Sequence, residues 1–340
     1  MRRYRRLAAV GVVTAVVLCA WLTAVPAAGQ SRATSPSTYT GKTPWGDPDL
    51  QGLWTTWDDT PLEAASADPA VAQKEATDSG RNREVGEDAN DLGGERVFKY
   101  NGQEYKYQGL GSGMGRERAG PRSVKRRALV VDPATGRIPV LPGKSHRETE
   151  ADLLDTWETH GAWARCITMG VPGRLLFGRP LNGYNKAYEI FQAPGYVVLM
   201  HEMIHEVRVI PVDGRPRLNP DIKLWQGSSR GHWEGQTLVV ETRNFNGRGQ
   251  GQPTSVPATE ALQVVERFTR VDEKTMQYEA TLTDPNVYAR PWKGMQYHNL
   301  DPSYTIFEYA CHEGNWRYME TTLARGRYLD AEAAKAKVGQ

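Results

Sequence analysis

Residues 195–211 read Gly-Tyr-Val-Val-Leu-Met-His-Glu-Met-Ile-His-Glu-Val-Arg-Val-Ile-Pro, and whether they form a helix or strands separates two possible folds. It is rich in β-branched residues and is bounded by the turn sequences Pro194-Gly195 and Asp213-Gly214, a pattern typical of β-strands. It also contains His201 to His205, His-Glu-Met-Ile-His, the spelling of a zinc-protease motif whose histidines lie one helical turn apart. Four residues along a strand span about 13 Å, too far for two imidazoles to bind one ion. The stretch therefore predicts β-structure, as two strands or one bent strand.

The strand pattern continues along most of the remaining chain. Strands are predicted at 49–55, 188–191, 196–203, 204–211, 236–245, 262–270, 275–283 and 304–310, with tight turns at 233–236 and 271–274, and a hairpin is predicted over 128–141. Regular strands joined by short turns favour an antiparallel meander, and closing it into a barrel removes exposed edges. One short helix is predicted near 147–159, where Ser145 and Glu148 form a capping box. The predicted fold is mainly β, an antiparallel meander closing into a lipocalin-like barrel.

Composition divides the chain into five parts. Residues 1–28 combine arginines, an apolar run and small residues, which predicts a signal peptide, with a retained membrane anchor as the alternative. Residues 29–45 predict a flexible tether, 46–325 a single barrel domain, 66–123 a polar insertion within it, and 326–340 a C-terminal tail. The protein is therefore expected in the periplasm or secreted.

Charge and cysteine content narrow the partners. The chain has 42 Lys and Arg against 40 Asp and Glu, a formal charge of +2, which disfavours a nucleic-acid partner. No run after the signal is long and apolar enough to span a membrane. Cys166 and Cys311 are the cysteines left after signal removal, so a disulfide is expected in an oxidising compartment, with two free thiols as the alternative.

Several motifs occur together in a specific order: Pro48-Asp-Leu-Gln-Gly-Leu-Trp54, Cys166 with Gly170-Val-Pro-Gly173, Glu202-Met-Ile-His205 leading to Ile210-Pro-Val-Asp-Gly-Arg215, Ser229-Arg-Gly-His-Trp-Glu-Gly235, and Tyr309-Ala-Cys-His-Glu-Gly-Asn315. From about 44 to 320 the chain resembles a large family of exported bacterial proteins that carries no assigned activity. In that family the segment resembles Glu-Met-Ile-His without a preceding histidine. The resemblance therefore implies that His201 is incidental.

A second resemblance is to lipocalin-like, or calycin, barrels. It rests on Gly52-x-Trp54 near the start of the first strand and on an arginine such as Arg317 near the end of the last strand. In those barrels such a tryptophan and arginine together plug the barrel. The resemblance implies a small hydrophobic ligand inside the barrel. Some similar barrels, such as carotenoid hydratases, are enzymes that use acid–base chemistry without a metal.

Polar residues inside the apolar strands are the candidates for chemistry. Strand alternation places Glu202, Glu206 and Arg208 on one face, where they form either an acid–base group or a buried ion pair. His205, on the other face, is a proton shuttle or a core histidine. For Glu202 and His205 to act together, the chain must bend or bulge near Ile204.

Further candidates lie elsewhere in the sequence. Arg230, in a segment that is either a site rim or a tight turn, could stabilise negative charge, and His312 lies beside Cys311. Residues that could contact a ligand, with core packing as the alternative, are Trp225, Trp233, Tyr278, Tyr309 and Glu308. No phosphate loop or dinucleotide motif is present, so no cofactor and no metal is predicted.

The predicted function is an exported β-barrel protein that binds a small apolar or aromatic molecule. We expect it to act as a metal-independent acid–base enzyme of the lyase, hydratase or isomerase type. One alternative is a lipocalin-like carrier without catalysis. The other is a zinc-dependent hydrolase that uses residues 201–205.

Overall fold

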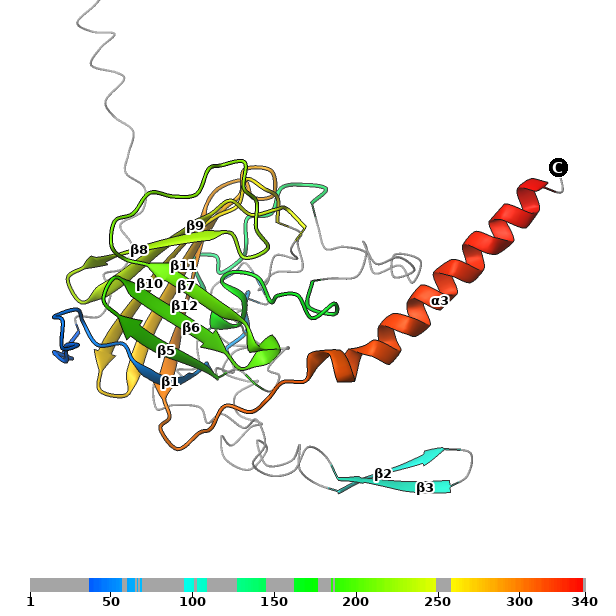
Figure 1. Ribbon diagram of the computed structural model, residues 1–340, viewed down its shortest axis with the longest axis horizontal. Helices are drawn as coiled ribbons and strands as arrows, with labels where there is room; N and C mark the ends of the chain where they lie inside the picture. The colour runs from blue at the N-terminus through cyan, green and yellow to red at the C-terminus, as the bar shows by residue number, and fades with distance from the viewer. Residues whose placement is uncertain are drawn as a thin grey trace, which may run out of the picture. The chain divides into compact units, whose positions relative to one another are not determined.

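The strands that flank His201 to His205 belong to one antiparallel sheet (Figure 1). The computed structural model describes residues 37–56, 60–64, 66, 68, 95–100, 103–108, 127–144, 162–176, 185, 187–248 and 258–338. The strand order is β7-β6-β5-β1-β12-β11-β10-β9-β8, and β4 also pairs with β12. The strands are β1 (Gly52–Thr55), β4 (Val130–Asp132), β5 (Tyr188–Ala193), β6 (Tyr196–His201), β7 (Val207–Pro211), β8 (Ser228–Glu234), β9 (Thr237–Arg243), β10 (Gln263–Asp272), β11 (Thr275–Thr283) and β12 (Trp292–Leu300).

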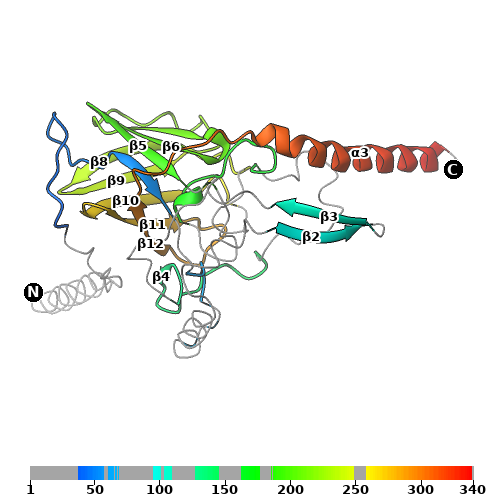
Figure 2. The ribbon, with the colours of Figure 1, turned by 90° about the horizontal axis from the view of Figure 1, so that it is seen from below.

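The sheet curls into a nearly closed barrel. Figure 2 shows β5 and β6 on one side of the curve and β11 and β12 on the other. The end strands β7 and β8 contact each other without ladder pairing. A Cβ at Gly231 on β8 would lie 2.8 Å from Val212 Cγ1 and 3.1 Å from Ile210 Cγ2, so side chains at the end of β7 and directly after it pack on the bare backbone of β8. The prediction of a mainly β, antiparallel barrel is confirmed.

Alternate residues of each strand face the interior of the barrel. On β11 these are Met276, Tyr278, Ala280 and Leu282, all of them in one large apolar cluster. The register places Tyr278 between Phe268 on β10 and Gln296 on β12, and the inward face of every strand follows from such pairs. The interior is therefore mostly apolar, and any polar residue at an inward position is exceptional.

Trp54 has an arginine partner of the kind that the lipocalin resemblance implies, but the residue is not Arg317. Arg317 lies on a helix, where its guanidinium is 5.3 Å from the ring centre of Trp316. Arg270, near the end of β10, is 5.3 Å from the Trp54 ring centre and 3.9 Å from that of Tyr39. The prediction of Arg317 was wrong because the chain from Cys311 onward is helix α3 and not a last strand of the barrel. Arg270 instead reaches the residues before β1, where its Nη1 donates to Asp49 O at 3.2 Å.

The C-terminal region differs from the sequence prediction. Residues 304–310, predicted as a strand, have no ladder partner, and helix α3 (Cys311–Val338) follows them. The predicted tail at 326–340 is therefore helical as far as Val338. Alanine, glutamate, lysine and arginine dominate its second half, and these residues have high helix propensity.

Smaller differences concern the N-terminal half. The predicted hairpin over 128–141 was wrong, because β4 pairs with β12 and Val140 bridges to Tyr288. The tether prediction was wrong for residues 37–45, since Thr38 N donates to Val271 O at 2.9 Å. Strands β2 (Glu95–Tyr100) and β3 (Gln103–Gln108) form a separate two-stranded sheet within the insertion. The predicted signal at 1–28 and helix at 147–159 lie outside the described residues.

Two short 3-10 turns complete the described elements: η3 (Gly173–Leu175) and η4 (Met203–His205). The described residues belong to one compact unit, Ser37–Gln340. No helix in the described parts of the chain is long and apolar enough to cross a bilayer.

Candidate functional site

The His-Glu-Met-Ile-His segment is the turn of a hairpin. Strand β6 ends at His201 and β7 begins at Val207, and His201 N donates to Glu206 O at 2.8 Å. The expected bend is present, because Ile204 and His205 have φ values of +64° and +43°. The segment therefore does not form the helix that the zinc motif requires. Among the described residues, no three His, Cys, Asp or Glu side chains are grouped so that they could hold a metal ion.

Glu202 is buried in this turn and fully hydrogen-bonded. Its Oε1 accepts from Asn185 Nδ2 at 2.6 Å and from Phe307 N at 3.1 Å, and its Oε2 accepts from Tyr304 Oη at 2.8 Å. These bonds attach the turn to the segment that precedes α3. The geometry gives Glu202 an anchoring role. His205 is exposed, and its backbone N donates to Glu202 O at 3.1 Å.

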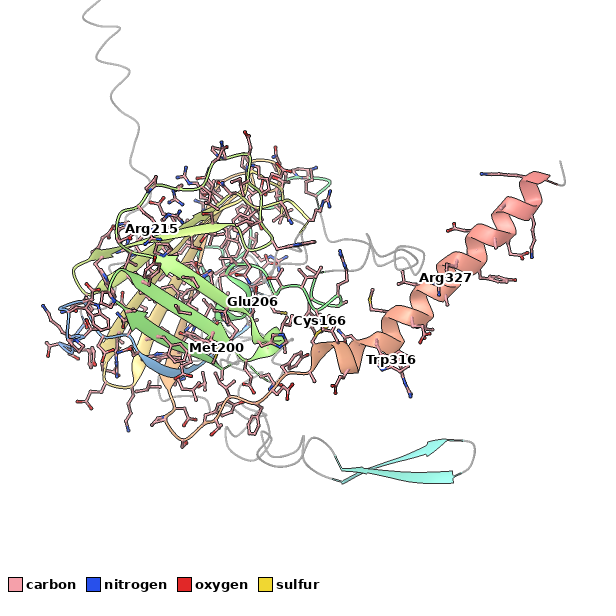
Figure 3. All side chains as sticks on the ribbon, viewed as in Figure 1. Cys166, Met200, Glu206, Arg215, Trp316 and Arg327 are labelled. Carbon is pink, nitrogen blue, oxygen red and sulfur yellow. A yellow bond between two sulfur atoms is a disulfide. The ribbon has the colours of Figure 1, made fainter. Side chains whose placement is uncertain are left out.

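Glu206 anchors a different segment at the same end of the barrel. Its carboxylate accepts from Thr168 Oγ1, from Gln226 Nε2 and, at 3.0 Å, from Met169 N. Burial raises the pKa of Glu206, and these hydrogen bonds together with the positive charge of Arg208 offset part of that rise. Figure 3 labels Glu206 and Cys166 near each other at this end of the barrel.

Inside the barrel, Arg208 of β7 meets Glu266 of β10. Arg208 Nη2 and Glu266 Oε2 are 2.8 Å apart, and the side chains are 7% and 0% exposed. Glu266 Oε1 accepts a hydrogen bond from Tyr278 Oη at 2.8 Å. Burial and the nearby Glu266 charge raise the pKa of Tyr278 well above its ordinary value, so this phenol stays protonated.

The ion pair leaves hydrogen-bonding capacity unused. In the part of the chain that the structure describes, Arg208 Nε, Arg208 Nη2 and Glu266 Oε2 have no hydrogen-bond partner, because the close ionic contact is not aligned as a hydrogen bond. The indole nitrogens of Trp233 and Trp292 are also buried, and neither has a hydrogen-bond partner among the residues that the structure describes. Buried polar atoms of this kind are rare in folded proteins.

A second polar group lies in the same interior. His298 of β12 is fully buried, with Nδ1 2.7 Å from Tyr188 Oη and Nε2 2.9 Å from Leu175 O. Burial lowers the pKa of His298 to about 3, so the ring is neutral. A carbonyl oxygen can only accept, so Nε2 carries the proton and Nδ1 accepts from the Tyr188 hydroxyl.

Aromatic contacts join the two polar groups. The ring of Tyr278 stacks on His298 with centres 5.1 Å apart, and Tyr188 stacks on His201 at 5.6 Å. Burial and the charge of Glu266 raise the pKa of Tyr188, which places this tyrosine within the field of the ion pair. The interior thus contains one connected set of polar side chains, which we call the inner cluster: Tyr188, Arg208, Glu266, Tyr278 and His298.

The inner cluster includes two of the residues singled out from the sequence, Arg208 and Tyr278. The other candidates are dispersed. Trp233 packs against the core, and Tyr309 packs against the disulfide. Trp225 is half-buried, with the Arg165 guanidinium 5.6 Å from its ring centre, and Arg230 donates to Pro216 O at 2.7 Å. His312 and Glu308 are exposed. The predicted disulfide between Cys166 and Cys311 is present, with Cα atoms 5.8 Å apart.

Sequence reasoning missed Tyr188 and His298 as candidates. The signal that could have found His298 is strand alternation, since it shares one face of β12 with Trp292, Gly294 and Gln296. No protein-family model matches the chain, and no curated protein or solved structure is significantly similar to it.

Proposed function

We propose that the barrel interior binds a small molecule beside Arg208 and Glu266 and that the inner cluster catalyses a proton transfer on it. The observation that carries this proposal is the buried ion pair with unpaired hydrogen-bonding atoms. Burying an ion pair is costly, and apolar residues of similar size are often as stable. A ligand that bonds to these atoms would explain why both charges lie inside the barrel.

The cluster contains the groups that acid–base chemistry needs. Glu266 is a carboxylate that can accept a proton from a ligand, and Tyr278 fixes its orientation by donating to Oε1. Arg208 can stabilise the negative oxygen that forms when a proton is removed next to a carbonyl group. The proton would thus move from a ligand carbon to the Glu266 carboxylate. In an isomerisation it would return to another carbon of the ligand, and in a dehydration it would be taken up by the hydroxide that leaves the neighbouring carbon as water. Such transfers underlie isomerase, hydratase and lyase reactions.

The surroundings indicate the class of ligand. Arg208 and Glu266 neutralise each other, so the interior favours an uncharged molecule. Both oxygens of Glu266 already contact Tyr278 or Arg208, whereas Arg208 Nε is a buried donor without a hydrogen-bond partner among the described residues, which favours a ligand with an oxygen acceptor. The aromatic rings of Tyr188 and Tyr278 suit a flat ring. An uncharged cyclic carbonyl compound satisfies all three conditions.

Export belongs to the same proposal. The arginines and apolar run of residues 1–28 have the pattern of a signal peptide, and a disulfide between Cys166 and Cys311 is stable outside the cytoplasm. N-terminal sequencing of protein purified from the cell envelope tests this part, and an intact N-terminus at Met1 would argue for a retained anchor. Membership of the family of exported proteins described above is likewise proposed on its motifs.

Binding is tested with a panel of small cyclic enones and phenols. Thermal unfolding is compared for the wild type, Glu266→Gln and Glu279→Gln. Glu279 is a matched control, because it is also buried and pairs with a cation, Lys293 at 3.7 Å, but faces outward on β11. We expect a compound that raises the melting temperature of the wild type and Glu279→Gln but not of Glu266→Gln. Equal shifts in all three proteins would contradict the site.

Catalysis is tested by hydrogen exchange. A compound that binds is incubated with the protein in D₂O, and NMR follows the loss of its C–H signals next to the carbonyl group. We expect exchange with the wild type and a fall of at least about 100-fold in Glu266→Gln, the usual effect of losing a general base. Binding without exchange would show a carrier instead of an enzyme.

A further inference from the structure

One segment of the chain reaches from the disulfide to the inner cluster. Residues 166–176, which we call the strap, begin at Cys166 and end in the core, where Leu175 and Leu176 are 0% exposed. Leu176 fills the space that Gly294 leaves on β12, since a Cβ at Gly294 would lie 2.3 Å from Leu176 Cδ2. His298 lies four residues after Gly294 on β12, and its Nε2 contacts Leu175 O. The strap therefore meets β12 at two places.

The other end of the strap has two anchors. Cys166 is joined to Cys311 at the start of α3, and Met169 packs with Met203, Ile204 and Cys311 in one buried cluster. Thr168 Oγ1 and Met169 N both donate to the carboxylate of Glu206. Glu206 is thus the polar contact that holds the middle of the strap against the hairpin turn.

The position of the strap determines the protonation pattern of a neutral histidine. While Leu175 O accepts from Nε2, the single ring proton stays on Nε2 and Nδ1 must accept from Tyr188. If the carbonyl moves away, the proton can move to Nδ1, which then donates to the Tyr188 oxygen. The hydroxyl proton of Tyr188 would then be free to bond to a ligand.

We propose that Glu206 is a positioning residue that, through the strap, selects the His298 tautomer and thereby the direction of the Tyr188 hydrogen bond. The effect on chemistry rests on the proposed function, because Tyr188 belongs to the inner cluster. The effect on the tautomer does not, and it is measurable without a ligand. The second glutamate of the turn, Glu202, provides a matched control, since it is also buried but bonds to residues 185, 304 and 307 instead of the strap.

The test uses the full chain labelled with ¹⁵N in its histidine rings. Ring-nitrogen shifts distinguish a protonated nitrogen from a bare one, and loss of a signal in His298→Gln assigns His298. In the wild type we expect Nε2 protonated and Nδ1 bare, unchanged between pH 7 and pH 5. In Glu206→Gln we expect a mixture of the two tautomers or a ring that titrates nearer to its ordinary pKa of about 6.5.

A second variant guards against a loss of folding. Thr168→Val removes one donor to Glu206 while keeping the shape of the side chain, so it should shift the His298 signals in the same direction. Glu202→Gln should leave them as in the wild type. The proposal is overturned if Glu206→Gln and Thr168→Val both keep the wild-type signals, or if Glu202→Gln changes them as much. Because no ligand is present, either result is independent of whether the barrel binds one.

Discussion

Neighbouring residues of the hairpin turn have different roles that their sequence motif does not distinguish. Glu202 and Glu206 are both buried and each accepts three hydrogen bonds, the first from the segment before α3 and the second chiefly from the strap. His205 lies between them, exposed, with a positive φ. The residue that looks most catalytic in the motif is thus the one residue of 202–206 that is exposed.

His205→Gly should therefore be tolerated. Glycine adopts a φ of +43° without strain, which favours the variant, whereas its greater freedom in the unfolded chain opposes it. We expect a change within about 1 kcal/mol in the free energy of unfolding, and no change in the His298 ring signals. Urea unfolding measures the first and NMR the second. A loss of several kcal/mol would show that the imidazole makes an essential contact.

His298 should make stability depend on pH. Its pKa is about 3 when folded and near 6.5 when unfolded, so between these values the unfolded chain binds the extra proton. Stability is then fully present above about pH 6.5 and falls as the pH drops toward 3. Between pH 7 and pH 5 the loss should be about 2 kcal/mol. Glu206, whose pKa is raised, acts in the opposite direction below neutrality.

The contribution of His298 is isolated by comparing variants in urea at both pH values. His298→Gln keeps one donor and one acceptor but does not titrate. Between pH 7 and pH 5, its free energy of unfolding should therefore fall by about 2 kcal/mol less than that of the wild type. His312→Gln, at an exposed position on α3, should behave as the wild type does. Equal acid losses in the wild type and His298→Gln would show that His298 does not titrate as proposed.

At the scale of elements, the sequence predicted strands where most inward positions are apolar and missed β12, where three successive inward positions are not. Strands β9, β10 and β11 have inward residues such as Leu238, Val264 and Leu282, and all three were predicted. Strand β12 was not, because its inward positions include Gly294, Gln296 and His298. These same positions receive the strap and the inner cluster. The pattern fails at the candidate site because residues there are not chosen for packing alone.

The fit of the strap on β12 gives an element-scale prediction. Gly294→Ala places a Cβ against Leu176 and should destabilise by about 1–3 kcal/mol, the usual cost of overpacking. Leu176→Ala should cost about 2–5 kcal/mol through the cavity it leaves. The double variant should lose clearly less than the sum, because the new methyl group occupies space that the leucine vacates. Additive losses in urea unfolding would mean that the two side chains do not compete for one space.

For the whole molecule, the barrel and the disulfide followed from sequence patterns, but the inner cluster did not. The disulfide was predictable because only two cysteines remain after the signal segment. The pairing of Arg208 with Glu266 depends on which strands face each other across the closed barrel, and local alternation gives only the face of each residue. Residues far apart in sequence meet there because the sheet curls back on itself.

The whole barrel also allows fold and function to be separated. Glu266→Ala should destabilise by about 3–5 kcal/mol, because it leaves the Arg208 charge buried and unpaired. Arg208→Met combined with Glu266→Leu replaces the pair by apolar side chains of similar volume, and should recover most of that loss or exceed the wild type. The same double variant should lose all binding of any compound that stabilises the wild type, as measured by thermal unfolding. A double variant that is stable and still binds would place the ligand elsewhere, whereas one as unstable as Glu266→Ala would make the ion pair a requirement of the fold.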